Sequence, residues 1–136
     1  TKDSDLSALV IAITESEGTP LSEAMSVEDM YRYYKTMAGF HFALIDAAKN
    51  SWLAHVYRSI ASTLARYQIM YLRKSDMRRS SNQEHKKILR HLQSGAFSDA
   101  KKELNAHIQR TVRDIRSKMT YESSTPAGGK NAMTVF

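Results

Sequence analysis

The sequence contains no cysteine, only two prolines and five glycines, and each scarcity excludes a class of protein. Without cysteine there is no disulfide, iron–sulfur cluster or cysteine-based zinc site, so a metal ion would have to be held by histidine and carboxylate groups. The absence of cysteine fits a reducing compartment such as the cytoplasm. No apolar stretch approaches the ~20 residues that a membrane span requires, and no secretory signal pattern is present.

The few prolines and glycines are placed so that a long central interval is almost free of them. Pro20 and Pro126 are the only prolines, and residues 21–125 hold only Gly39 and Gly95. Because both residue types interrupt helices, this interval favours an all-helical domain. The 136 residues, 42% hydrophobic and 25% charged, fit one soluble domain with a single core.

Hydrophobic periodicity predicts an all-α fold, an antiparallel helical bundle of about five to six helices over residues 1–120, followed by a disordered tail over residues 121–136. Two helix starts, at Ser26 and Ser81, are predicted from an acidic residue three positions later, the spacing of a capping box. The expected helices run from about Ser4 to Glu17, from Ser26 to about Ala48, from Asn50 to about Arg73, from Ser81 to Gly95, and from Ser98 to about Thr120.

The formal net charge of +6 raises the question of a polyanionic partner. Seven basic residues and only two acidic ones lie between Arg73 and Arg90. No aromatic residues alternate with these charges, as a surface for single-stranded nucleic acid would prefer, so we interpret the cluster as a solvated helix face and loop. A nucleic-acid-binding surface is the alternative, and its binding would fall steeply with salt.

Three histidines provide the sharpest functional signal. His41, His85 and His107 each fall on the apolar stripe of a different predicted helix, so packing of the stripes would point three imidazoles into one interior. Such a set, with open coordination positions, suits a divalent ion such as zinc or nickel. A single histidine on an apolar stripe is more often a hydrogen-bonded core residue. His55 and His91 lie off their stripes and are expected at the surface.

Enzyme signatures are missing from the sequence. It has no Glu-x-x-His pair, no His-Glu-x-x-His motif, no adjacent histidine and aspartate, and no nucleophile elbow or phosphate loop in a structured segment. No carboxylate is expected on the three histidine stripes to serve as a general base. A helical metalloenzyme, a metal-dependent hydrolase using the same histidines, remains the alternative to a binding domain.

Four short blocks resemble one known family. They are Phe40-His41 with Ala43-Leu44, Ala47, Ala48 and Asn50; Glu84-His85 with Ile88-Leu89; Gly95 with Ala100; and His107-Ile108. In this order they resemble the C-terminal effector domain, the FCD domain, of FadR-type members of the GntR transcription regulators. The resemblance covers about residues 1–118.

The resemblance implies a usually homodimeric bundle that senses a small organic acid and controls a separate winged helix-turn-helix domain that binds DNA. Many such bundles hold a divalent metal with three histidines and one aspartate, and the effector carboxylate completes the metal's shell. Here Met37 stands at the position of that aspartate. Glu103 is considered as a substitute ligand from another helix, with a solvated glutamate as the alternative.

Two further expectations follow from the resemblance. Thr1 to Ile13 resembles the family's second helix, so the first helix and the DNA-binding domain are expected to be missing from this chain. The expected effector contacts are Met37, with Tyr34 and Tyr57 as hydrogen-bonding groups, and Arg58 or Arg66 to neutralise a second acidic group. The alternative places both arginines in solvent and the tyrosines in the core.

Overall fold

A computed structural model describes residues 3–19, 22 and 24–124 of the chain. Its helices are α1 (Asp3–Glu17), α2 (Val27–Ala47), α3 (Ser51–Leu72), α4 (Ser75–Gln93) and α5 (Phe97–Ser124). No β-strand occurs among the described residues. The predicted all-α fold is therefore confirmed, with five helices.

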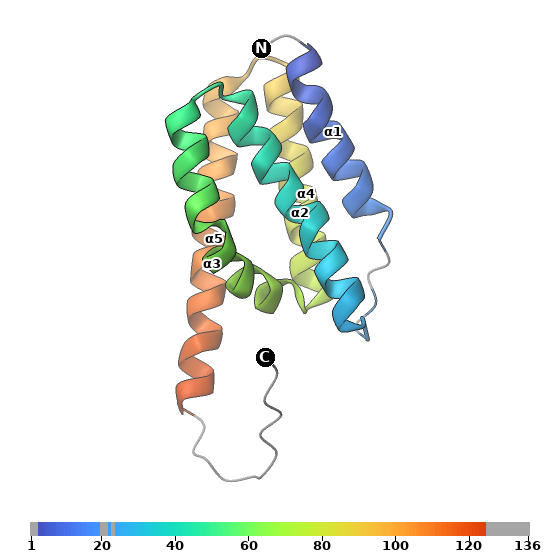
Figure 1. The fold of residues 1–136 in the computed structure, drawn as a ribbon, viewed down its shortest axis with the longest axis vertical. Helices are drawn as coiled ribbons and strands as arrows, with labels where there is room; N and C mark the ends of the chain where they lie inside the picture. The colour runs from blue at the N-terminus through green and yellow to red at the C-terminus, as the bar shows by residue number, and fades with distance from the viewer. Residues whose placement is uncertain (1–2, 20–21, 23, 125–136) are drawn as a thin grey trace.

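Successive helices run in opposite directions, so the fold is an antiparallel bundle (Figure 1). Helix α1 packs against α2 and α4, while α5 lies along α4 and α3 lies mainly against α2. The C-terminal part of α5 extends beyond the other helices, at the bottom of Figure 1. Within the described ranges, none of the helices has the length and apolar character needed to cross a bilayer.

Local signals set most of the helix ends. Ser26 caps α2, because its side chain accepts a hydrogen bond from the Asp29 amide at 3.0 Å, which confirms the predicted capping box. Asn50 caps α3 in the same way through the Leu53 amide. At the end of α4, Gly95 adopts a positive φ of 73°, a conformation that glycine takes without steric cost.

The predicted start of α4 at Ser81 is wrong by six residues. The helix begins at Ser75, and Ser81 is buried in its interior. Glu84, which the sequence pattern assigns to a capping box, instead reaches across to α5 and bonds His107 and Arg110. A capping box describes only local hydrogen bonds, whereas the Glu84 side chain takes its partners from another helix.

The end of the bundle differs slightly from expectation. Helix α5 continues to Ser124, four residues past the expected end at Thr120, so the first part of the predicted tail is helical. The rest of the predicted disordered tail lies outside the described residues.

Two clusters of buried apolar side chains form the core. The first joins α1, α2 and α4, and the second joins α2 to the end of α3. Their buried members are Leu6, Leu9, Ala12, Ile13, Phe40, Ile88 and Leu89 in the first, and Met30, Tyr33, Met37, Tyr71 and Leu72 in the second.

Six of the seven residues of the basic cluster are exposed, as expected for a solvated face, and Arg78 is the exception. Its side chain is fully buried, and its guanidinium donates to the carbonyl oxygens of Leu72, Arg73 and Ser22 at 2.6–2.9 Å. The first two carbonyls lie at the C-terminal end of α3, where the helix dipole favours a positive charge. One arginine therefore ties the α1–α2 connection and the end of α3 to α4.

We predict that Arg78→Ala lowers the free energy of unfolding by about 3 kcal/mol, because three carbonyls lose a charged donor in a buried setting. Urea unfolding followed by circular dichroism measures the change. The matched control is Arg79→Ala, since Arg79 is exposed and has only a 3.9 Å contact with Asp76. That variant should stay within about 0.5 kcal/mol of the parent. Equal effects of the two substitutions would contradict the role of Arg78.

Candidate metal centre

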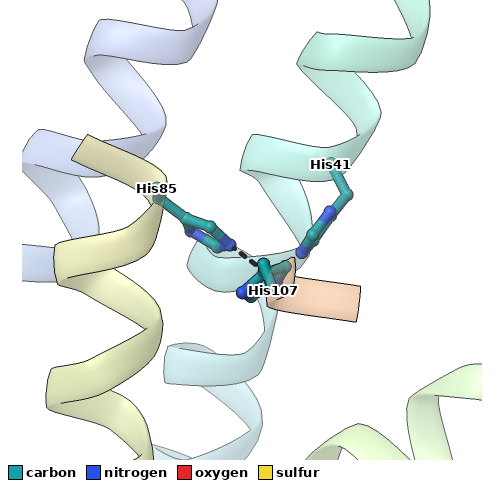
Figure 2. A group of neighbouring side chains, drawn as sticks. All are labelled: His41, His85 and His107. Atoms are coloured by element: carbon teal, nitrogen blue, oxygen red, sulfur yellow. Dashed lines mark hydrogen bonds between the residues drawn. The ribbon is translucent and has the colours of Figure 1, made fainter. Parts of the chain in front are cut away.

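Three helices each bring one histidine to the same place inside the bundle. His41 comes from α2, His85 from α4 and His107 from α5, and Figure 2 shows their rings converging. His85 and His107 are buried, and His41 is partly buried. The structure thus brings together the three imidazoles that the sequence pattern singles out.

The spacing of the ring nitrogens fits the coordination of one ion. The Nε2 atoms of His85 and His107 lie 3.4 Å apart, and one nitrogen from each of the three rings lies within 4.8 Å of the others. Two nitrogens bound tetrahedrally at about 2.0–2.1 Å from zinc are separated by roughly 3.3–3.4 Å. His85 and His107 already have this separation, and His41 would complete the set if its ring moved inward by up to roughly 1.5 Å.

Packing holds the rings in place around a small cavity. The ring of Phe40 stacks on that of His85 with centroids 3.9 Å apart, while the rings of His41 and His107 lie 5.3 Å apart at a small angle. The cavity beside the three histidines has a volume of about 30 Å³. A cavity needs a volume of at least ~10–15 Å³ in this measure to hold one water molecule. This cavity therefore has room for an ion and little more.

Burial keeps the three imidazoles neutral. Burial, reinforced by the neighbouring His107, lowers the pKa of His41 to about 3. Burial and then the two other histidines hold the pKa of His85 well below its usual value. Burial also lowers the pKa of His107, although its hydrogen bond with Glu84 acts in the opposite direction. At neutral pH the rings therefore have lone pairs available for a metal ion.

A carboxylate lies directly behind one of the histidines, which corrects the expectation that none accompanies them. The Nδ1 of His107 is within hydrogen-bond distance of a carboxylate oxygen of Glu84, at 2.6 Å. Arg110 binds the same carboxylate with two nitrogens and also contacts the hydroxyl of Tyr71. Burial alone would raise the pKa of Glu84, but the hydrogen bonds from Arg110 and His107 lower it. Glu84 is therefore ionised at neutral pH.

The other residues predicted to contact a ligand divide into two groups. Tyr34 and Met37 line the cavity with the three histidines. Arg58 instead pairs with Asp46 at 2.7 Å on the surface, and Arg66 is exposed. Tyr57 packs edge-on against Phe42, and none of these three lines the cavity.

Glu103 lies away from the three histidines. Its carboxylate pairs with Lys87 of α4 at 2.8 Å, so it is a paired surface group and not a fourth ligand in this arrangement. The same contact divides the basic cluster, because Lys87 is neutralised there. Lys86 similarly pairs with Glu17. Three members of the cluster, Arg79, Lys86 and Lys87, thus form ion pairs, and Arg78 is buried.

Sequence analysis missed Glu84, Arg110 and Tyr71 as neighbours of the site. Arg110 follows His107 by three residues, which places both on one face of α5, so its proximity could have been found from helical spacing. Glu84 precedes His85 directly and was assigned to a cap. No local signal connects Tyr71 to either residue, because its contact with Arg110 joins α3 to α5.

The geometry defines a helical domain built around a small cavity with three convergent imidazoles. Residues 6–110 match the family model described as the FCD domain. The chain therefore belongs to the FCD domain family, the effector-binding domain of GntR-family regulators, as the sequence blocks indicate. No curated protein and no solved structure matches the chain. Membership in a family of regulators favours a regulatory role over the metalloenzyme alternative.

We predict that the metal-free chain loses stability as the pH falls below about 6.5. The unfolded state then takes up a proton on His41 that the folded state, with a pKa of about 3, does not. This difference in proton uptake lowers the free energy of unfolding by up to about 1.4 kcal/mol for each unit by which the pH falls, for this one group. Urea unfolding between pH 7 and pH 5.5 in the presence of a chelator measures the slope.

His41→Gln should make that slope shallower, because glutamine does not titrate. The exposed His55 supplies the control, and His55→Gln should keep the parental slope. A His41→Gln variant with the parental slope would show that the buried imidazole does not resist protonation.

Proposed function

We propose that this chain is a ligand-sensing regulatory domain that binds a small carboxylate effector through a divalent metal, zinc or nickel, held by His41, His85 and His107. The observation that carries the proposal is the convergence of three neutral imidazoles on one cavity in a chain of the FCD family. Zinc and nickel both accept imidazole nitrogen ligands. The proposed effector-binding domain spans residues 1–120.

The cavity wall indicates how an effector would be held. A bound ion supplies a localised positive charge with coordination positions that the protein leaves open. The aspartate position of the family pattern is taken by Met37, which lines the cavity and brings no oxygen ligand. Carboxylate oxygens of the effector are therefore suited to fill the shell, and Tyr34 lies at the cavity wall to donate a hydrogen bond to them.

The small size of the cavity suggests how binding becomes regulation. The cavity of about 30 Å³ is smaller than an organic acid, so we propose that the effector favours an arrangement in which the helices around the cavity lie further apart. Only such a difference in affinity between two arrangements can shift their populations. Three of the expected effector contacts lie outside the cavity, namely Arg58, Arg66 and Tyr57. They could contact an effector only in an arrangement with a wider cavity.

The output of this shift is proposed to lie outside the chain. A winged helix-turn-helix domain joined to this one would bind DNA in the cytoplasm, and the change in the bundle would alter how a dimer presents two such domains. Within the basic cluster, Lys86 and Lys87 form ion pairs with Glu17 and Glu103, which reduces the charge that this cluster presents to a polyanion.

We predict that the purified, untagged chain carries about one zinc or nickel ion, because three neutral imidazoles at this spacing bind such ions. The variant His41→Ala with His85→Ala should lose the ion. Elemental analysis before and after incubation with each metal, followed by desalting, measures the content.

Small di- and tricarboxylic acids should then bind the metal-loaded chain and not the metal-free chain in titration calorimetry.

The control is His55→Ala with His91→Ala, which removes two histidines that lie outside the cluster. This variant should keep the full metal content. A parent chain that stays metal-free after incubation with both ions would refute the proposed metal centre. Equal loss in both double variants would point to unspecific surface binding.

The proposed domain works as a homodimer, and one face of α3 supports this. Between residues 51 and 70 of α3 no side chain is buried within the monomer. Several apolar side chains, 36–46% exposed, follow the three-and-four spacing of a helix-pairing seam. The exposed members of the seam are Leu53, Ile60, Tyr67 and Met70, with Val56 and Thr63 completing the spacing. A 22-residue helix offers about 33 Å of length for pairing with its copy.

We predict that Ile60→Glu combined with Tyr67→Glu converts the dimer to a monomer, because four charges would face one another across the seam. Light scattering coupled to size exclusion measures the molar mass. Ile11→Glu on α1 is the control, because Ile11 is also an exposed apolar residue but lies on another helix. A dimer that survives the double substitution would place the interface elsewhere.

A further inference from the structure

The carboxylate of Glu84 occupies the side of His107 that faces away from the other two histidines. One carboxylate oxygen lies 2.6 Å from Nδ1 of His107, while the opposite ring nitrogen, Nε2, lies 3.4 Å from Nε2 of His85. Glu84 itself does not line the cavity. The two nitrogens of His107 therefore have different surroundings, one facing a carboxylate and one facing the cavity.

This arrangement selects one tautomer of the neutral ring. An ionised carboxylate accepts hydrogen bonds and cannot donate one, so the proton of His107 belongs on Nδ1. The lone pair is then on Nε2, where it points toward His85 and the cavity. The opposite tautomer would set a lone pair against a carboxylate and a proton against the position of the ion.

Glu84 is held in place by a second helix. The Nε of Arg110 donates to one of its oxygens at 2.6 Å, and a terminal nitrogen donates to the other at 2.5 Å, a two-point contact that fixes the plane of the carboxylate. Another terminal nitrogen of Arg110 contacts the hydroxyl of Tyr71. About four-fifths of the Arg110 side chain is shielded from solvent, so the contact is not a loose surface ion pair.

We infer that Glu84, clamped by Arg110, is the positioning residue of the metal centre, which fixes the tautomer and orientation of His107 so that Nε2 is presented to the ion. The inference rests on the proposed function. Carboxylates behind ligating histidines act in this way in other metal sites, and their loss costs about 10–100-fold in metal affinity.

A simple role in holding α4 to α5 is the competing explanation, and Glu103 provides the matched control. It also joins these two helices through an ion pair, with Lys87 at 2.8 Å, and it lies on α5 four residues before His107. The difference is that its carboxylate has no contact with a histidine among the described residues. Glu103→Gln therefore removes an interhelical charge pair without touching the proposed ligands.

The first test uses the metal-free chain, so it does not depend on the metal. Two-bond ¹⁵N–¹H correlation spectra of histidine side chains distinguish the Nδ1–H from the Nε2–H tautomer. We expect His107 of the parent chain in the Nδ1–H form. In Glu84→Gln the glutamine amide can donate to Nδ1, which shifts the ring toward the Nε2–H form. An Nε2–H ring in the parent would overturn the inference, whether or not the variant folds.

The second test measures zinc affinity by competition with a chromogenic chelator. Glu84→Gln should bind zinc about 10–100-fold more weakly than the parent, whereas Glu103→Gln should bind within about twofold of it. Equal affinities of Glu84→Gln and the parent would overturn the positioning role. A parent chain that binds no zinc would instead refute the metal centre, and the tautomer measurement would still decide what Glu84 does to His107.

Discussion

Three imidazoles can share the interior of this bundle only while they are uncharged. His85 and His107 are buried, their Nε2 atoms lie 3.4 Å apart, and a proton added to either ring would bring a charge into a site with little water. Stacking of Phe40 on His85 removes further solvent from the cluster. The same exclusion of water that makes protonation costly leaves one nitrogen lone pair on each neutral ring, and a bound ion would replace the 3.4 Å hydrogen bond between the Nε2 atoms of His85 and His107. Neutrality thus connects the packing of the bundle with its capacity to bind a metal ion.

The two buried or half-buried arginines near the centre both have hydrogen-bond acceptors for their terminal guanidinium nitrogens. Arg78 donates to three carbonyl oxygens, and Arg110 pairs with Glu84, so neither guanidinium faces the imidazoles without a partner. Both arginines also connect helices, since Arg78 reaches the end of α3 and Arg110 contacts Tyr71 near that end. The end of α3 is therefore held firmly to the bundle, whereas its first twenty residues contribute no buried side chain.

The sequence predicts what depends on local periodicity. Apolar spacing gives the helices and places the three histidines inward, and the Ser26 cap is correct because its hydrogen bond lies within four residues. The failures at Arg78 and Glu84 involve partners far along the chain. One of the three acceptors of the buried Arg78 is the carbonyl of Ser22, fifty-six residues away, and Glu84 turns to His107, twenty-three residues away. A local pattern assigns such side chains to solvent or to a cap, since it contains no information on the opposing helix.

The three-histidine set also bears on how metal and effector would depend on each other. With Met37 at the cavity wall, the described residues bring three imidazole nitrogens and no carboxylate to the cluster, so a bound ion would keep open coordination positions. A carboxylate that fills the shell stabilises the ion, and by linkage the ion strengthens binding of the carboxylate by the same factor. An aspartate in place of Met37 would supply part of that stabilisation permanently and would weaken the coupling. On the proposed function, the thioether therefore makes retention of the metal more dependent on the effector, and the domain becomes a joint sensor of both.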